Sequence, residues 1–171
     1  MPIFIRQLSV ESINEWIKDL EKLKRKQIPN IALKTADRLA DEMLKDVSNV
    51  KGYKETTKIG ATLDGNIAIA GIENKEKKAQ FKEFGTGIVG SQNPHIAEAL
   101  QQAGWKYDVN NHGEKGWVYP VENGEYRWTK GQPASKEFWR ALEKAEELFP
   151  KIAREEFLRE VGRWDATRYI W

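Results

Sequence analysis

Six side chains in the middle of the chain are of the types that enzymes use for hydrolysis. They are the carboxylates Glu83, Glu114, Glu122 and Glu125 and the imidazoles His95 and His112. Two carboxylates in different environments can act as general acid and general base, and carboxylates with histidines can hold a divalent metal ion. The sequence does not place these groups together, and neither histidine has an acidic residue four positions further on, as in a helical zinc motif. We therefore expect polar loop residues and predict no catalytic residue, no metal site and no cofactor; a metal-dependent hydrolase or nuclease is the alternative.

A glycine-rich segment at residues 85–90 matches the G-x-G-x-x-G pattern of dinucleotide-binding loops. That pattern indicates a dinucleotide site only where a strand precedes it and a long helix opens from it. Pro94 follows four residues after the last glycine, which argues against a long helix here. We interpret Gly85 and Gly87 instead as positions where the backbone takes a positive φ or lies close to a neighbouring segment.

Two further groups of side chains could bind a partner. The basic residues within 22–26 could contact phosphates, which gives a second alternative, a nucleic-acid-binding module aided by aromatic stacking from the loop. The same residues are also typical of a solvated helix face. In the last segment, residues 164–171, the side chains of Trp164, Tyr169 and Trp171 are either anchors for a partner surface or part of a disordered end.

The first half of the chain predicts two helices and a hairpin. Apolar residues recur every three or four positions over residues 9–27, which is typical of an amphipathic helix. Pro29 lacks an amide hydrogen, so we expect this helix to end or bend there before the pattern resumes over residues 31–47. Residues 53–72 contain two β-branched runs around an Asp-Gly pair at 64–65, which predicts a β-hairpin.

The second half predicts another hairpin and a long final helix. We predict strands at residues 116–120 and 125–128, on either side of an Asn-Gly pair at 123–124 whose residue types suit a tight turn. A final amphipathic helix is expected to open at Pro133 and to be interrupted at Pro150.

A long loop at residues 88–115 connects the two hairpins, with one short helix expected at residues 94–103. Long connections of this kind are usually functional or mobile. The loop has too few apolar residues for a core of its own. We therefore expect Trp105, Tyr107 and the short helix to be buried against another surface, which in an assembly would be the next subunit.

Composition and charge limit the class of protein. The 171 residues fit a single domain over residues 1–171, with its core at about 10–160. The 28 basic and 26 acidic residues leave a net charge of +2, too balanced for a protein whose main task is holding nucleic acid by charge. The absence of cysteine excludes disulfides and thiolate metal sites.

No apolar run reaches the roughly 20 residues that a membrane span needs, and the first residues lack a signal peptide, so we expect synthesis in the cytoplasm. The expected fold class is α+β. It has a small, mainly antiparallel sheet of about four strands, flanked by a long N-terminal helix and a C-terminal helix.

Two short motifs and their order in the chain resemble a known family. The motifs are Glu83-Phe84-Gly85-Thr86-Gly87 after the first hairpin and Gly131-Gln132-Pro133-Ala134 before Phe138-Trp139, with a Trp-Val-Tyr strand at 117–119 between them. In this order they resemble the tail-component family of long-tailed bacteriophages and prophages, whose members are also called minor capsid, head-tail joining or tail-completion proteins. The similarity covers about residues 10–160, although the 88–115 loop is longer than in the simplest members.

The resemblance implies a structural protein of the virion and not an enzyme. Such proteins form an oligomeric ring, often of six copies, in the neck between the head connector and the tail tube. The implied partners are further copies of the chain, the connector or adaptor proteins and the tail-tube protein, with DNA only as cargo through the ring and no membrane. The chain would be made in the host bacterial cytoplasm, and the state of the isolated subunit, monomeric or not, stays open. A balanced charge is compatible with packing many copies together.

Overall fold

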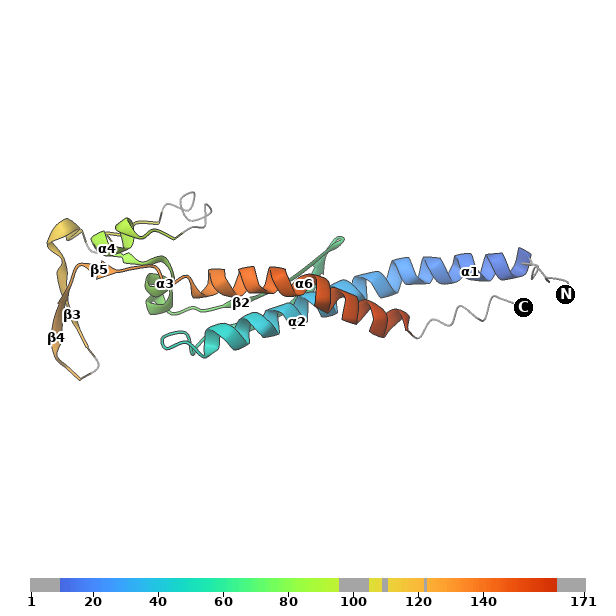
Figure 1. Cartoon of the computed structure of the whole chain (residues 1–171), viewed down its shortest axis with the longest axis horizontal. Coiled ribbons are helices and arrows are strands. Elements are labelled where there is room, and N and C mark those ends of the chain that lie inside the picture. The colour runs from blue at the N-terminus through green and yellow to red at the C-terminus, as the bar shows by residue number, and fades with distance from the viewer. Residues whose placement is uncertain (1–9, 96–104, 109–110, 122, 163–171) are drawn as a thin grey trace, which may run out of the picture. The chain divides into compact units, whose positions relative to one another are not determined.

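The computed structural model describes residues 10–95, 105–108, 111–121 and 123–162 of the chain (Figure 1). Contacts within the chain divide it into two compact units. Unit 1 holds residues 1–41, 59–71 and 146–171, and unit 2 holds residues 42–58 and 72–145. The single domain expected over residues 1–171 stays a prediction.

Helix α1 (Val10–Lys22) continues through a π-helical segment, η1 (Leu23–Gln27), into α2 (Ile28–Ser48). The amide of Ile28 donates to the carbonyl of Leu23, which is the wider spacing of a π-helix. Pro29 has no amide hydrogen, and its ring would collide with the carbonyl four residues earlier in a regular helix. The interruption expected at Pro29 is therefore a widening of the helix just before it, and the helix does not end there.

Four strands of the described residues form two separate sheets of two strands each. Strand β1 (Thr57–Asp64) pairs with β2 (Ile67–Glu73), and β3 (Trp117–Pro120) pairs antiparallel with β4 (Tyr126–Thr129) (Figure 1). Both hairpins and their turns were expected, and Gly65 and Gly124 have the positive φ that such turns require. The expected single sheet of about four strands is not confirmed, because in the described residues the two hairpins do not pair with each other.

Two short helices occupy the segment around the glycine-rich motif. Helix α3 (Lys77–Phe84) was not anticipated from the sequence, and α4 (Gly87–Gln92) lies where we expected an irregular glycine loop. The dinucleotide interpretation lacks its required context, because a helix and not a strand precedes the glycines, and the helix that begins at Gly87, within the motif, has only 6 residues. The short helix expected at 94–103 lies mostly outside the described residues. A 3₁₀ turn, η2 (Gly113–Lys115), leads into β3.

The last helix, α6 (Glu137–Val161), differs from the expectation at two points. It begins after Pro133, because Gly131 and Gln132 form the short strand β5 (Gly131–Gln132), which bridges to Gly87 and Thr86. It also continues through Pro150. Glu146, whose carbonyl loses its helical partner at Pro150, is exposed, so water can satisfy that carbonyl.

The small apolar core of unit 2 includes residues from the first turns of α6. Val47, Tyr53, Ala79 and Ala141 are buried together, with Met43, Val50, Ile72 and Phe138 packed around them. The rings of Tyr53 and Phe138 lie 5.8 Å apart. In the described part of the chain, no helix combines the length and the apolar character needed to cross a membrane.

Candidate functional site

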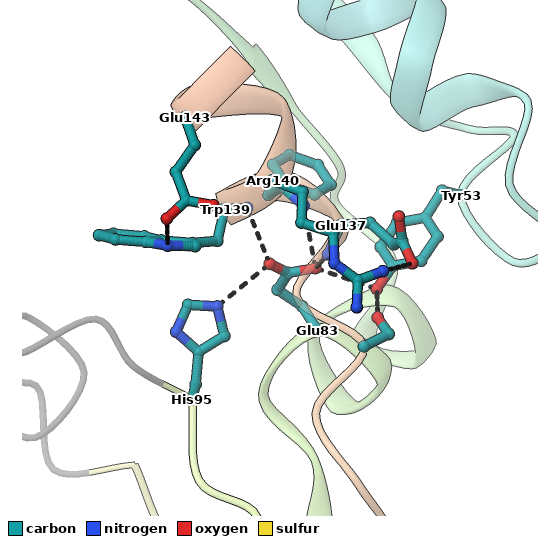
Figure 2. A network of polar contacts seen from close by, with 9 residues as sticks. Tyr53, Glu83, His95, Glu137, Trp139, Arg140 and Glu143 are labelled. Carbon is teal, nitrogen blue, oxygen red and sulfur yellow. Dashed lines mark hydrogen bonds and ion pairs between the residues drawn. The ribbon is translucent and has the colours of Figure 1, made fainter. Parts of the chain in front are cut away.

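In the described part of unit 2, hydrogen bonds from several segments converge on Glu83, near the end of α3. Its side chain is buried, with 5% of the residue exposed, and its carboxylate faces the first turn of α6 (Figure 2). Oε2 accepts hydrogen bonds from the amides of Glu137 and Phe138 at 2.8 and 3.1 Å. Oε1 accepts one from the amide of Trp139 at 3.2 Å. Glu83 therefore caps α6 and satisfies the amides that an isolated helix leaves without partners.

Two side chains from elsewhere in unit 2 complete the shell of donors around this carboxylate. The fully buried hydroxyl of Tyr53 donates to Oε2 at 3.1 Å and also bonds to the hydroxyl of Ser135. The Nε2 atom of His95 lies 3.2 Å from Oε1. Because a carboxylate only accepts, this contact requires a hydrogen on Nε2 of His95.

The environment of Tyr53 keeps its phenol neutral beside the carboxylate of Glu83. The amino end of α6 carries the positive end of the helix dipole and points three amides at the carboxylate. Burial raises the pKa of the Tyr53 phenol well above its usual range, helped by the nearby charge of Glu83. Tyr53 thus stays protonated and remains a donor. With both oxygens engaged by donors, the Glu83 carboxylate is arranged as a structural acceptor and has no free position for a substrate proton.

Aromatic rings enclose the His95 side of the carboxylate. The His95 ring meets the rings of Phe84 and Trp139 edge to face, at centroid distances of 5.5 and 5.9 Å. Trp105 lies 5.0 Å from Phe84 and donates from Nε1 to the carbonyl of Gly85 at 3.2 Å. Burial against these rings explains why His95 is 5% exposed. His95 lies in the loop after α4, as expected of a polar loop residue, but it is buried and contacts Glu83.

The two motifs that carry the family resemblance lie against each other. Thr86 bridges to Gln132, and Gly87 bridges to Gly131. Gly85, Gly87 and Gly131 have positive φ values of 78°, 62° and 103°. A Cβ on Gly87 would lie 2.2 Å from the carbonyl oxygen of Lys130, and one on Gly131 would lie 1.9 Å from that of Thr86. The predicted need for positive φ and close approach is confirmed at Gly85 and Gly87, and it extends to Gly131.

The remaining residues singled out in the sequence do not join this site. His112 is exposed just before η2, Glu114 is exposed within η2, and Glu125 is exposed at the turn between β3 and β4. Glu122, Trp164, Tyr169 and Trp171 lie outside the described residues. Tyr107 is half-buried, and its carbonyl accepts a hydrogen bond from the amide of Gly87. Trp105 and Tyr107 thus contact their own subunit's glycine motif, while their role between subunits stays a prediction.

Sequence reasoning missed Tyr53 and Ser135. Neither stands in a motif, and Tyr53 precedes Glu83 by 30 residues. Capping by Glu83 was also missed, since the usual sequence signal for a cap is a polar residue directly before the helix. Here that position is Lys136, whose φ of 60° turns the chain into α6. Among the described residues there is no group of three or more His, Cys, Asp or Glu side chains that could hold a metal ion.

Unit 1 has a charged groove between α2 and α6. The groove is open, has a volume of about 340 Å³ and is lined by Leu33, Lys34, Asp37, Arg38, Ala61, Glu156 and Arg159. Arg38 donates to Glu156 at 2.6 Å and to Glu155 at 2.8 Å. These hydrogen bonds raise the pKa of Arg38 and lower the pKa of Glu155. The acids and bases of the groove pair with each other, so it does not form a site for an anion.

The β3–β4 hairpin exposes one apolar face. The pairing of Val118 with Trp128 and of Pro120 with Tyr126 puts these four side chains on the same face. All four are exposed, with 58% of Val118, 73% of Tyr126 and 59% of Trp128 accessible to solvent. We call this surface the hairpin face. Apolar side chains gathered on a sheet face usually mark a contact with another molecule.

Comparison of the chain with models of protein families, with curated proteins and with solved structures finds no match.

Proposed function

We propose that the chain is a structural protein of a tailed bacteriophage or prophage. In this proposal it joins head and tail, or completes the tail, by assembling into a ring in the neck of the virion. The ring would lie between the connector or adaptor and the tail tube, and DNA would pass through it. The proposal rests first on the resemblance of residues 83–87 and 131–134 to the tail-component family.

The observation that carries the proposal is the meeting of these two motifs in one packed cluster. The bridges Thr86 to Gln132 and Gly87 to Gly131 hold the glycine motif against the segment before α6. Glu83 then fixes the start of α6 through three amides. Two motifs that are distant in sequence but form one contact behave as a single structural signature. Such a signature supports the resemblance more strongly than either short motif would alone.

The hairpin face supports the assembly part of the proposal. Both edges of the two-stranded β3–β4 sheet are open in the described residues, and its apolar face is exposed. Residues 113–132 contain three acidic and three basic residues, so the hairpin has no net charge to attract nucleic acid. A neutral, aromatic surface of this kind fits a protein neighbour. In a head-to-tail ring, that neighbour is the next subunit.

The two alternatives have less support. A metal-dependent hydrolase or nuclease has the contact of Glu83 with His95 in its favour, but both oxygens of that carboxylate already accept several hydrogen bonds. A nucleic-acid-binding module would rely on the basic residues within 22–26, which are exposed. Their charge is offset by the acidic residues earlier in the same helix.

The test is disruption of the gene in the phage or induced prophage that encodes it, followed by electron microscopy of the lysate. We expect DNA-filled heads and separate tails in place of joined particles, with restoration by the wild-type gene in trans. Joined, infectious particles without the protein would overturn the proposal. An arrest before DNA packaging would overturn it in favour of an earlier, enzymatic or DNA-handling role.

A further inference from the structure

The N-terminal helix of unit 1 exposes an apolar stripe. Ile13, Ile17 and Leu20 follow each other at spacings of four and three residues, which places them on one face of α1. They are 41%, 46% and 36% exposed. Helix α1 continues through η1 into α2, but its own turns are stabilised in water mainly by burying their apolar face. This face therefore needs a partner.

Charge along the same helix is divided between its two halves. Residues 10–21 contain four acidic residues and one lysine, whereas residues 22–27 contain four basic residues and no acid. If two such helices lay side by side in parallel, the acidic halves would face each other, the basic halves would face each other, and like charges would repel. In antiparallel orientation each acidic half lies beside the basic half of the other copy, and the two helix dipoles also oppose each other favourably.

We propose that α1 and η1 of one copy pair antiparallel with α1 and η1 of a second copy, covering the stripe of Ile13, Ile17 and Leu20 in the free protein. The charge pattern is what selects this occupant, since the helix is complementary to itself in this orientation. An antiparallel pair is closed by a two-fold axis and stops at a dimer. The pairing concerns the protein before assembly and does not depend on the proposed role in a phage neck.

Sedimentation velocity on the full chain tests the pairing. At roughly 50 μM protein and low salt we expect a species of twice the 19.7 kDa of the subunit, and we expect added salt to shift it toward the monomer. A monomer at all concentrations would overturn the proposal. In that case the stripe is covered by another part of the same chain or by a different protein.

A matched pair of double variants tests the face. Ile13→Gln with Ile17→Gln removes two stripe residues, and we expect the dimer to dissociate roughly tenfold or more readily. Ile67→Gln with Ile69→Gln makes the same change at two exposed residues of β2, outside α1, and also leaves the net charge unchanged. Equal dissociation constants for the two double variants would overturn the proposal. Helix content by circular dichroism checks that both variants remain folded.

Crosslinking tests the orientation. The chain has no cysteine, so single substitutions give unique attachment points. Asn14→Cys and Arg25→Cys place thiols near opposite ends of the helix, at exposed positions. With a short bis-maleimide we expect crosslinked dimer from the mixture of the two variants and little from either alone. Efficient crosslinking of each variant alone, with none between them, would show a parallel pair and overturn the proposal.

Discussion

Glu83 shows how one side chain can fix the start of a distant helix. It caps α6 across 54 residues of sequence, and its two oxygens accept from three amides and the Tyr53 hydroxyl, with His95 in contact as well. Because the amides of a helix's first turn otherwise face solvent or remain unpaired, a buried start of this kind depends on such an acceptor.

Replacing Glu83 by Gln should destabilise the fold despite the nearly identical shape. One acceptor oxygen becomes an amide nitrogen that faces donors, which leaves buried N–H or O–H groups unpaired at a cost of about 2–4 kcal/mol in the free energy of unfolding. Urea denaturation measures the loss. Glu143→Gln is the control, because Glu143 is exposed and accepts only from Nε1 of Trp139 among the contacts shown in Figure 2. Similar losses in both variants would contradict the capping role.

Comparison of Gly87 with Gly65 distinguishes the cost of a left-handed backbone from the cost of a steric collision. Their φ values are 62° and 59°, but a Cβ on Gly87 would meet the Lys130 carbonyl at 2.2 Å, whereas one on Gly65 would meet nothing within 4 Å. Alanine at either site has the cost of a left-handed backbone, and Gly87→Ala should cost on the order of 2 kcal/mol more. Thermal or urea unfolding of the two variants gives the difference. Equal destabilisation by the two variants would contradict this prediction. It would mean that residues 83–87 and 131–133 can move apart at little cost in free energy.

At the scale of elements, local patterns predicted the helices and hairpins better than their ends. The long amphipathic helices and both turns follow from periodicity and from the Asp-Gly and Asn-Gly pairs. The start of α6 was misplaced because Pro133 is typical of a first turn, whereas bridges between β5 and the glycine motif keep residues 131–132 extended. Helix α3 has only 8 residues and little periodicity, so it gave no signal.

The candidate site was only partly predictable, because sequence patterns report local conformation and not contacts between distant segments. Glycine types indicated the special backbone at Gly85 and Gly87, since few other residues tolerate it. The contacts that Glu83 makes with Tyr53 and α6 join segments far apart in sequence, and no spacing rule reports such contacts. The sequence also did not indicate that the two hairpins form separate sheets. An alternating pattern identifies a strand but not the strand that lies beside it.

The contact between α2 and α6 in unit 1 should make stability depend on acidity. Arg38 lowers the pKa of Glu155 below its unfolded value of about 4.3, so the contribution is present above that pH and is lost as the pH falls through the folded pKa. The urea midpoint of the wild type should therefore fall between about pH 5 and pH 3. Arg38→Gln should flatten this dependence, whereas Lys77→Gln at an exposed position should leave it unchanged. An unchanged slope in Arg38→Gln would contradict the role of this pair.

At the scale of the whole molecule, the described residues expose two apolar surfaces that are of the kind that usually contacts another molecule. The stripe on α1 and the hairpin face are both open. Their chemistry differs, since the α1 helix carries separated charges and the hairpin has no net charge. Because different chemistry suits different partners, we propose a second free copy for α1 and the neighbour in a ring for the hairpin face, and the two proposals can be tested independently.

The hairpin face should be required for assembly and not for folding. Val118 and Tyr126 are 58% and 73% exposed, so replacing both by Ser should change the free energy of unfolding by only about 0.5 kcal/mol or less. In complementation of the disrupted gene, the same double variant should lower the titre of infectious particles at least tenfold, because the apolar contact with the neighbour is lost. Tyr119→Ser with Arg127→Ser is the matched control, since this directly opposed pair lies on the other face of the same hairpin. Full titre with Val118→Ser and Tyr126→Ser, or an equal drop with the control, would contradict the assignment of this face to the ring.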